Sequence, residues 1–559
     1  MDRRAFLRTG ATSAGAAFLG INPVIAQGGD YDLVLRNGLL FDGLGSEPMT
    51  GDVAIRGERI AAIGRLGTVA RGTTVVDLGG LALSPGFVDI HSHTDLSLLV
   101  NHRAESKIRQ GVTTEVTGQD GSSIGPWSEA QFNRTREDYR TRHGVTIDFR
   151  DLSGFFARLE RERPAVNVAS MVGQGTVRGY VVGADDRPAT AAELERMQML
   201  VRAALAAGAC GMSTGLEYTP SGFASTAELA ALATALAVTG LPYSSHMRNE
   251  DERLFAAVEE AITIASRSGV PVQISHLKAQ GQRNWWKSLP VIQTIRDARA
   301  SGLDVAFDVY PYIAYSTGLA NLFPLAMRDG GDTAFLGRLR DADGRAAAER
   351  AVREKVGELG SWNSVQVTST GSDSLAWARG RRLGTLAEER GEDPFELLLH
   401  LVIEDRNRAG MVGFGMSEEN VEMKLAEPLS IVCSDGGAWA PYGPLSAGSP
   451  HPRTYGAFPR VLGHYARDRN VLSLQEAIRK MTSAPARRLR LEGRGELAVG
   501  AFADLVAFDP STVADQATFE QPHQYPRGIP HVLVNGTFAI RDGEHTDSRS
   551  GRVVRPRRG

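Results

Sequence analysis

Eight short apolar runs, several of them followed by helical patterns, constrain the fold of this chain more than any other feature. Strand-like runs that alternate with helical patterns are typical of βα units around a parallel sheet. Eight such units predict an α/β fold, the (β/α)8 or TIM barrel, over residues 86–486. The runs lie at 86–91, 112–118, 167–172, 210–214, 243–246, 272–276, 305–310 and 429–434.

Two segments outside this region have a different pattern, in which short strands are separated by Gly, Asp and Asn. Neither residues 27–85 nor residues 487–559 hold enough strands to bury a core alone. We therefore expect both chain ends to form one small discontinuous β-sandwich. A long stretch separates the seventh and eighth barrel strands, and we expect an insertion there, at about 318–428, that covers the barrel mouth.

Residues 1–26 resemble an export signal of the twin-arginine type. Arg3 and Arg4 precede a weakly apolar, Ala/Gly-rich stretch, and small residues then lead to a suitable cleavage point before Gln27. The alternative is a ragged basic N-terminus. With a signal, the mature protein works in the periplasm or outside the cell. No later stretch has the roughly 20 apolar residues that span a bilayer, so we expect no stable membrane insertion.

Composition bounds the partners of this chain. A net charge of −3, without a basic stripe and interleaved aromatic residues, gives no support to a nucleic-acid partner. Cys210 and Cys433 are the only cysteines, so no disulfide framework holds the chain together, and we expect both to be buried thiols. The sequence leaves the oligomeric state open.

Histidines stand at the ends of several predicted strands. His91 and His93 end the first strand at i, i+2 spacing, and alternate side chains of a strand point to the same side. His246 and His276 end the fifth and sixth strands, and Asp435 follows the eighth. Because catalytic groups of such barrels lie at the carboxyl ends of the strands, we expect these side chains to converge.

Imidazole and carboxylate groups are ligands of zinc. With Asp120, which follows the second strand, the four histidines and Asp435 can hold one or two divalent ions and leave a position for water. A bound zinc lowers the pKa of water from 15.7 to about 7, and a neighbouring carboxylate can pass its proton to a leaving amine. These residues therefore predict metal-dependent hydrolysis.

Longer motifs surround these residues and resemble the amidohydrolase superfamily, most closely its D-aminoacylase (N-acyl-D-amino-acid deacylase) branch. They include Ser-Thr-Gly-Leu-Glu-Tyr at 213–218, Ile-Ser-His-Leu-Lys at 274–278 and Asp-Val-Tyr-Pro-Tyr at 308–312. Further matches lie at 111–114, 246–248, 434–436 and 456–463. The motifs span nearly all of the mature chain, and the resemblance also implies the split β-sandwich and the insertion.

The resemblance implies a role for each matching residue. It places His246 and His276 on the more tightly held metal and His91 and His93 on a second, weaker position. It makes Asp435 the catalytic acid and base.

Four further residues match family positions that contact substrate. These are Lys278, Tyr310, Ser316 and Arg453. Tyr310 would stabilise the developing oxyanion, since a hydroxyl donor aimed at new negative charge lowers its energy. Lys278 and Arg453 would bind the substrate carboxylate.

The chain departs from the family after the second strand. The family commonly has Gly-Asn-Cys-Gly there, with a cysteine shared between the two metal positions, and this chain has Gly-Gln-Asp-Gly at 118–121. Asp120 can still bridge two ions as a harder oxygen donor, although a simple turn residue is the alternative. Glu115 and Glu217 are reserve bridging candidates, and Gln174 stands where histidine is frequent.

Several other residues have plainer interpretations. We expect Asp95 to support the turn after the first strand by hydrogen bonds and His451 to be a structural loop residue. Trp285 and Trp286 either line the mouth of the pocket or pack on the surface.

The sequence thus predicts an exported, metal-dependent hydrolase of a C–N amide bond. The favoured substrate is an N-acyl-D-amino acid, cleaved to a carboxylate and a D-amino acid, with the D configuration implied by the resemblance alone. Another amide or cyclic amide, such as a dipeptide, a hydantoin or an aryl amide, is the alternative. A non-catalytic barrel scaffold is an alternative of a different class, and it is disfavoured because four histidines and Asp435 are present.

Overall fold

The computed structural model describes residues 30–66 and 71–557, so the expected signal at 1–26 lies outside the described residues. A ring of parallel strands forms the centre of the molecule. Its strands are β6 (Phe87–Asp89), β7 (Val112–Thr117), β8 (Asn167–Ser170), β9 (Val172–Gly173), β10 (Met212–Gly215), β11 (Tyr243–His246), β12 (Val272–Ile274), β13 (Val305–Val309) and β17 (Ser430–Val432).

The ring has eight positions because β8 and β9 are one run interrupted at Met171. Strand β8 pairs with β7, and β9 pairs with β10. The ring closes between β17 and β6, where Ser92 bridges Gly436 and the Asp435 N–H donates to the His91 carbonyl at 2.9 Å. The predicted (β/α)8 barrel is therefore confirmed.

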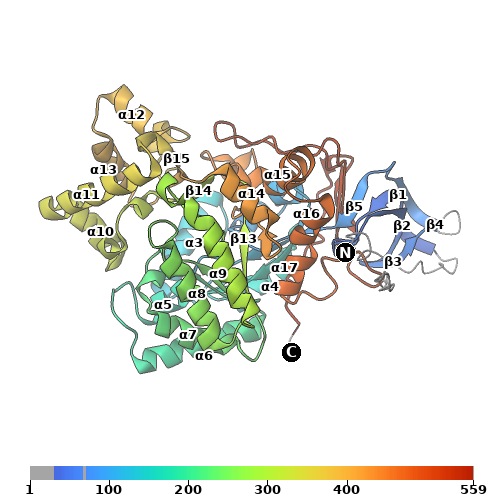
Figure 1. Ribbon diagram of the computed structural model, residues 1–559, viewed down its shortest axis with the longest axis horizontal. Helices are drawn as coiled ribbons and strands as arrows, with labels where there is room; N and C mark the ends of the chain where they lie inside the picture. The colour runs from blue at the N-terminus through green and yellow to red at the C-terminus, as the bar shows by residue number, and fades with distance from the viewer. Residues whose placement is uncertain (1–29, 67–70, 558–559) are drawn as a thin grey trace, which may run out of the picture.

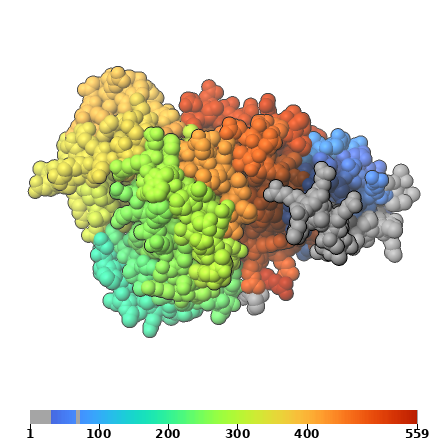
Figure 2. Space-filling view, in the orientation of Figure 1, coloured from blue at the N-terminus to red at the C-terminus, as the bar shows by residue number. Residues whose placement is uncertain are grey.

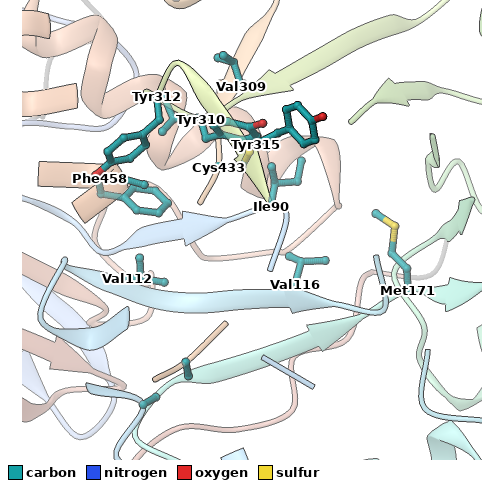
Figure 3. Packing of buried hydrophobic residues seen from close by; sticks show 14 of the residues in the cluster. Ile90, Val112, Val116, Met171, Val309, Tyr310, Tyr312, Tyr315, Cys433 and Phe458 are labelled. Carbon is teal, nitrogen blue, oxygen red and sulfur yellow. The ribbon is translucent and has the colours of Figure 1, made fainter. Parts of the chain in front are cut away.

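Apolar side chains fill the interior of this ring. Figure 3 shows Ile90, Val116, Met171 and Cys433 beside one another, contributed by different parts of the chain. Both cysteines are free and buried, as expected. The interior is a packed core, so the working residues lie on the loops above it.

Helices surround the barrel and alternate with its strands. Figure 1 shows α6 to α9 lying side by side along one flank. Helix α6 begins with a capping box between Thr190 and Glu193 and ends at Gly208, which has a positive φ of 115°. The helices between β6 and β13 are α1 (Ser97–Val100), α2 (Glu105–Ile108), α3 (Glu129–His143), α4 (Leu152–Glu162), α5 (Gln174–Val181), α6 (Ala191–Ala207), α7 (Thr226–Ala233), α8 (Leu254–Ser268) and α9 (Ser288–Ala300).

One further helix precedes the last barrel strand, β17, and three follow it. They are α14 (Glu418–Ala426), α15 (Arg453–Arg460), α16 (Leu474–Met481) and α17 (Ser483–Arg488). A π-helical segment, Val461–Asp468, continues α15. None of the described helices is long and apolar enough to cross a bilayer.

The two ends of the chain share one nine-stranded sheet, on the right in Figure 1. Strand β5 pairs antiparallel with β18, where Pro85 faces Leu505. Leu33, Val53 and Leu533 lie in one apolar cluster that draws on both ends. The strands are β1 (Asp30–Leu40), β2 (Met49–Arg56), β3 (Arg59–Gly64), β4 (Arg71–Asp77), β5 (Ala82–Pro85), β18 (Leu505–Phe508), β19 (His531–Val534), β20 (Thr537–Arg541) and β21 (Glu544–His545).

A separate lobe occupies the long connection between β13 and β17, and Figure 2 shows it projecting from the barrel. Its antiparallel strands are β14 (Ala314–Gly318), β16 (Gly410–Phe414) and β15 (Val365–Ser369), in that order. Its helices are α10 (Gly331–Arg340), α11 (Ala342–Leu359), α12 (Leu383–Arg390) and α13 (Pro394–Glu404). Compared with the expected range of 318–428, the lobe's sheet begins earlier, and α14 packs against β13, β17 and α9 of the barrel.

Candidate metal centre

The carboxyl ends of the barrel strands meet at the floor of a cavity of about 740 Å³. His91 and His93 follow β6, His246 is the last residue of β11, and His276 lies two residues after β12. Asp435 lies above β17 and lines the cavity together with His93. The structure therefore brings together the histidines and the aspartate that the sequence predicted to converge.

Asp120 lies at the centre of this group. Its Oδ1 is 3.4 Å from His91 Nε2 and 3.5 Å from His276 Nε2. Its Oδ2 is 3.4 Å from His93 Nε2 and 3.6 Å from His246 Nδ1. Each carboxylate oxygen thus lies near two histidines, one that follows β6 and one at the end of β11 or after β12.

Two metal-competent groups share this aspartate. In the first, ligand atoms of His91, His93, Asp120 and Asp435 lie within 4.8 Å of one another. In the second, the same limit holds for Asp120, His246 and His276. Asp120 belongs to both groups, so its two oxygens would be available to one ion or to two, at the position where the related family commonly has a cysteine sulfur.

Local backbone geometry explains why glycines flank Asp120. Asp120 has a φ of 51°, in the left-handed region that aspartate tolerates better than most residues. A Cβ on Gly118 would lie 2.1 Å from the Met171 carbonyl oxygen, and one on Gly121 would lie 2.7 Å from the Gly215 nitrogen. The tight Gly-Gln-Asp-Gly loop therefore folds against the neighbouring strands only because the glycines at its two ends, Gly118 and Gly121, lack side chains.

The polar atoms of this cluster fit a divalent metal ion. The Nε2 of His91 and the Oδ1 of Asp120 face each other in this cluster, are buried and have no hydrogen-bond partner among the described residues. Buried polar atoms without partners are uncommon in proteins and call for an explanation such as an ion. Imidazole nitrogens and carboxylate oxygens at this spacing are the donor set that zinc accepts.

Charges in the cluster are strongly coupled. Burial acts to raise the pKa of Asp120, but His91, His276 and His246 hold it well below its usual range. Burial acts to lower the pKa of His93, yet Asp120 and Asp435 raise it to about 9. Metal ligation needs neutral imidazoles, so binding of an ion here releases protons.

Asp435 is held from two sides. Its Oδ1 is 3.0 Å from His93 Nε2, and its Oδ2 is 2.7 Å from Arg453 Nη1. Burial acts to raise the pKa of Asp435, whereas Arg453, His276 and His91 hold it well below its usual range. The guanidinium of Arg453 also lies 4.7 Å from the centre of the Tyr310 ring. Asp435 is thus an ionised base beside the metal cluster.

The other residues predicted to contact substrate lie around the same floor. Ser316 lines the large cavity. Tyr310 is buried, and its hydroxyl lies 3.9 Å from Met416 Sδ. Lys278 is also buried, and its Nζ is 2.7 and 2.9 Å from the two oxygens of Glu250. Their contacts with substrate stay predictions.

Several residues have a part that the sequence did not indicate. Glu250 lies 3.0 Å from His276 Nδ1, and Asp308 lies 3.5 Å from His91 Nδ1. His451 is buried in the cavity wall, where its Nδ1 accepts the Arg453 N–H at 3.0 Å. Glu250 and His451 do not stand at the end of a predicted strand, so their positions in the sequence did not mark them. Asp308 belongs to the 308–312 motif, which we used only for the family resemblance.

The remaining candidates separate into two groups. Glu217 lies 3.5 Å from His246 Nε2, whereas Glu115 accepts from Ser92 Oγ at 2.6 Å and belongs to no metal-competent group of the described chain. Gln174 is buried and accepts from Ser221 Oγ at 2.5 Å. Asp95 accepts the Gly118 N–H at 3.3 Å, which supports the turn as expected.

Neither Trp285 nor Trp286 lines the cavity. Trp285 donates its indole N–H to the Gly415 carbonyl at 2.8 Å, and Trp286 is 63% exposed beside Phe255. The surface-packing alternative is therefore the one that the structure supports.

Comparison with known proteins agrees with this geometry. The model of the amidohydrolase family matches residues 74–540. The chain belongs to the amidohydrolase family. A D-aminoacylase of Alcaligenes xylosoxydans xylosoxydans is 37% identical to this amidohydrolase, over 94% of the chain and 97% of the relative. An N-acyl-D-glutamate deacylase of the same organism is 36% identical, over 94% and 96%.

Solved structures resemble this amidohydrolase over most of its length. A D-aminoacylase crystal structure has a TM-score of 0.79 at 36% identity and covers 94% of this chain and 100% of its own. The N-acyl-D-glutamate deacylase of Bordetella bronchiseptica, complexed with zinc and a phosphonate mimic of the tetrahedral intermediate, has a TM-score of 0.79 at 33% identity, with the same coverage. The family and the His/Asp cluster together show a metal-dependent hydrolase of C–N bonds other than peptide bonds.

Proposed function

We propose that this amidohydrolase removes the acyl group from N-acyl-D-amino acids and releases a carboxylate and a D-amino acid. The observation that carries the proposal is the placement of Asp435 between His93 and Arg453, where it lines the same open cavity as Asp120. The similarity to a D-aminoacylase and to an N-acyl-D-glutamate deacylase supports the choice of substrate.

The site residues divide the chemistry among them. One or two zinc ions, held by the four histidines, Asp120 and Asp435, would supply Lewis acidity and a lowered pKa for the attacking water. Because Arg453 keeps Asp435 ionised, this carboxylate can accept a proton from the attacking water and deliver it to the leaving nitrogen. Arg453 is paired with Asp435 and Lys278 with Glu250, and both cations would bind the substrate α-carboxylate.

The alternative within the same chemistry is a different substrate, namely another amide or a cyclic amide. Hydantoinase structures have TM-scores near 0.54 at 16% identity, so they share the fold alone with this chain. A non-catalytic scaffold is the alternative of a different class. It is disfavoured because the four histidines, Asp120 and Asp435 all meet in one cluster.

A screen of N-acetyl amino acids tests the substrate. Both enantiomers of several N-acetyl amino acids and a hydantoin are incubated with the purified enzyme and zinc, cobalt or manganese. We expect turnover of D-enantiomers at least about 100-fold faster than of L-enantiomers, since a handedness-specific site leaves buried charges unpaired with the wrong isomer. Equal rates for both enantiomers, or hydrolysis of the hydantoin alone, would contradict the proposal.

We also propose that the protein is exported through a twin-arginine-type signal at residues 1–26. Changing Arg3 and Arg4 together to lysine keeps the charge but removes the arginine pair. We expect the variant to remain in the cytoplasm, whereas the wild type is found in the periplasm or medium. Cell fractionation with a cytoplasmic marker distinguishes the two, and equal export of both proteins would remove this proposal.

A further inference from the structure

Three carboxylates, two of them buried and one half-buried, lie behind three histidines of the cluster, on the side away from Asp120. Asp308 Oδ1 is 3.5 Å from His91 Nδ1, whose Nε2 faces Asp120. Glu217 Oε2 is 3.5 Å from His246 Nε2, whose Nδ1 faces Asp120. The same relation holds for a third pair, His276 and Glu250.

The pairing of ring nitrogens decides what these carboxylates can do. A neutral imidazole that binds a metal with one nitrogen carries its hydrogen on the other, and that buried N–H needs an acceptor. His91 Nδ1 and His246 Nε2 have no hydrogen-bond partner among the described residues, so Asp308 and Glu217 are the acceptors within reach. Their separation of 3.5 Å is slightly longer than an ordinary hydrogen bond.

Glu250 is held more firmly than the other two. Its oxygens accept from Lys278 Nζ at 2.7 and 2.9 Å and from Gln280 Nε2 at 2.8 Å. Lys278 Nζ is also 2.6 Å from His276 Nδ1. An ammonium can only donate, so this contact makes His276 Nδ1 an acceptor, and Glu250 serves as the partner of Lys278.

We propose that Glu217 and Asp308 are positioning residues that hold His246 and His91 in the tautomer that binds metal. Each carboxylate accepts the N–H of its histidine and leaves the lone pair of the other nitrogen directed at Asp120. Glu217 serves the second metal-competent group, and Asp308 serves the first. The proposal concerns metal affinity and does not depend on which amide is the substrate.

Glu217 provides the sharpest test, because its carboxylate also accepts from Asn321 Nδ2 at 3.1 Å, a residue outside the metal cluster. Glu217→Leu removes the acceptor, and Glu217→Gln keeps a neutral one. Zinc affinity is measured by titration against a competing chelator, and the ions per chain are counted by elemental analysis. Glu228→Gln is the matched control, since Glu228 is a buried carboxylate that pairs with Arg178 at 3.2 Å away from the cluster.

We expect zinc affinity to fall about 10- to 100-fold in Glu217→Leu, the range typical for loss of a carboxylate behind a ligand histidine. Glu217→Gln should lie between this variant and the wild type, and Glu228→Gln should match the wild type. Unchanged affinity in Glu217→Leu would overturn the proposal. Loss of one whole ion per chain, with the remaining affinity unchanged, would also overturn it, because Glu217 would then be a ligand itself.

A second inference concerns the wall of the large cavity. Arg134 and Gln131, three residues apart on α3, both line it. Arg134 is exposed and has no ion-pair or hydrogen-bond partner within 30–66 and 71–557. The carboxylates that line the cavity are Asp120 and Asp435, and both are engaged at its floor. The wall therefore presents one uncompensated guanidinium to the cavity.

We infer that Arg134 forms a subsite for a second negative charge on the substrate, beyond the α-carboxylate. This inference rests on the proposed function and narrows it to N-acyl-D-amino acids with an additional carboxylate. That carboxylate can belong to the amino-acid side chain or to the acyl group, and guanidinium binds either in the same way.

Three substrates separate these sources. They are N-acetyl-D-glutamate, N-succinyl-D-leucine and, as the neutral reference, N-acetyl-D-leucine. For Arg134→Gln we expect kcat/KM to fall about fivefold on one of the two dianionic substrates, the effect of one exposed ion pair, with the neutral reference unchanged. Arg136→Gln is the matched control, since Arg136 is exposed on the same helix but does not line the cavity.

An equal effect of Arg134→Gln on all three substrates, or no effect on any, would overturn the subsite while leaving the proposed function intact. Failure of the wild type to hydrolyse any of the three would overturn the proposed function, and the subsite with it.

Discussion

Asp435 must remain a base although it is buried. Isolated burial favours the protonated form of a carboxyl group, and here Arg453 at 2.7 Å reverses that preference. The same aspartate lies within ligand distance of the first metal-competent group. Its two oxygens therefore face different partners, one toward His93 and the other toward Arg453.

Asp435→Asn tests this residue directly. The amide keeps an oxygen near His93 but cannot take up a proton, so we expect kcat to fall by about 10²- to 10⁴-fold. Metal content should stay close to that of the wild type, because three ligands of the first group remain. Steady-state kinetics and elemental analysis on the same preparation measure both quantities. Asp373→Asn, at a fully exposed aspartate, should change neither. Retained turnover in Asp435→Asn would remove the residue from the mechanism.

The ligands were predictable from sequence because each stands at the end of an apolar run, and the carboxyl ends of barrel strands meet in space. Asp120 was predictable as a candidate only through its place after the second strand. Glu250 and His451 were not, since they lie in loops with no strand-end position to mark them. Their proximity to the site depends on how the loops fold over the barrel.

At the scale of elements, the barrel strands were predictable and the lobe's sheet was not. The apolar runs of the barrel are short and separated by helices, so parallel pairing is the only arrangement that buries them. Strands β14, β15 and β16 pair antiparallel across helices α10 to α13. Such pairing depends on contacts between distant segments, and no local pattern in 318–428 indicates it.

Helix α14 contributes a buried cation to the barrel wall. Burial, together with Lys278, lowers the pKa of Lys424 to about 7, and Lys424 Nζ donates to Ser288 Oγ at 3.2 Å. An unfolded chain would bind this proton with the ordinary lysine pKa of 10.5. Between pH 7 and about 10 the unfolded state therefore holds more protons, and the contribution of Lys424 to stability rises with pH.

Lys424→Met should stabilise the protein most at low pH. We expect the free energy of unfolding to rise by up to about 5 kcal/mol at pH 6 and the gain to disappear above about pH 10. Lys355→Met is the control of opposite sign, because Lys355 pairs with Asp251, which raises its pKa. Thermal unfolding at pH 6, 8 and 10 measures both variants. A gain for Lys424→Met that is independent of pH would contradict the assignment of a buried cation.

At the scale of the whole molecule, the metal cluster joins distant parts of the barrel. Its residues lie at or just after the carboxyl ends of five different strands, and Asp120 contacts His91, His93, His246 and His276. A ligand that binds only the folded protein stabilises it by an amount that grows with the logarithm of the ratio of free ligand concentration to Kd. Metal ions at this position should therefore stabilise the fold as well as support catalysis.

Removal of metal tests this coupling. After dialysis against a chelator, we expect activity to be lost and the unfolding temperature to fall by several degrees, corresponding to about 4 kcal/mol at a thousandfold excess of ion over Kd. Zinc, cobalt or manganese should restore both. Calorimetry and activity assays of the same samples give the result. An unfolding temperature that is unaffected by the chelator, with activity retained, would contradict metal dependence.

The pairing of β5 with β18 has a consequence for biosynthesis. Strand β5 is made early, but the edge that it offers is covered only when residues 505–508 have left the ribosome. The cluster around Leu83 likewise needs Leu505 and Leu533, which are translated much later than β5. In a nascent polypeptide the early half-sheet therefore stays incomplete until those residues emerge, so this sheet is among the late parts of the fold to form.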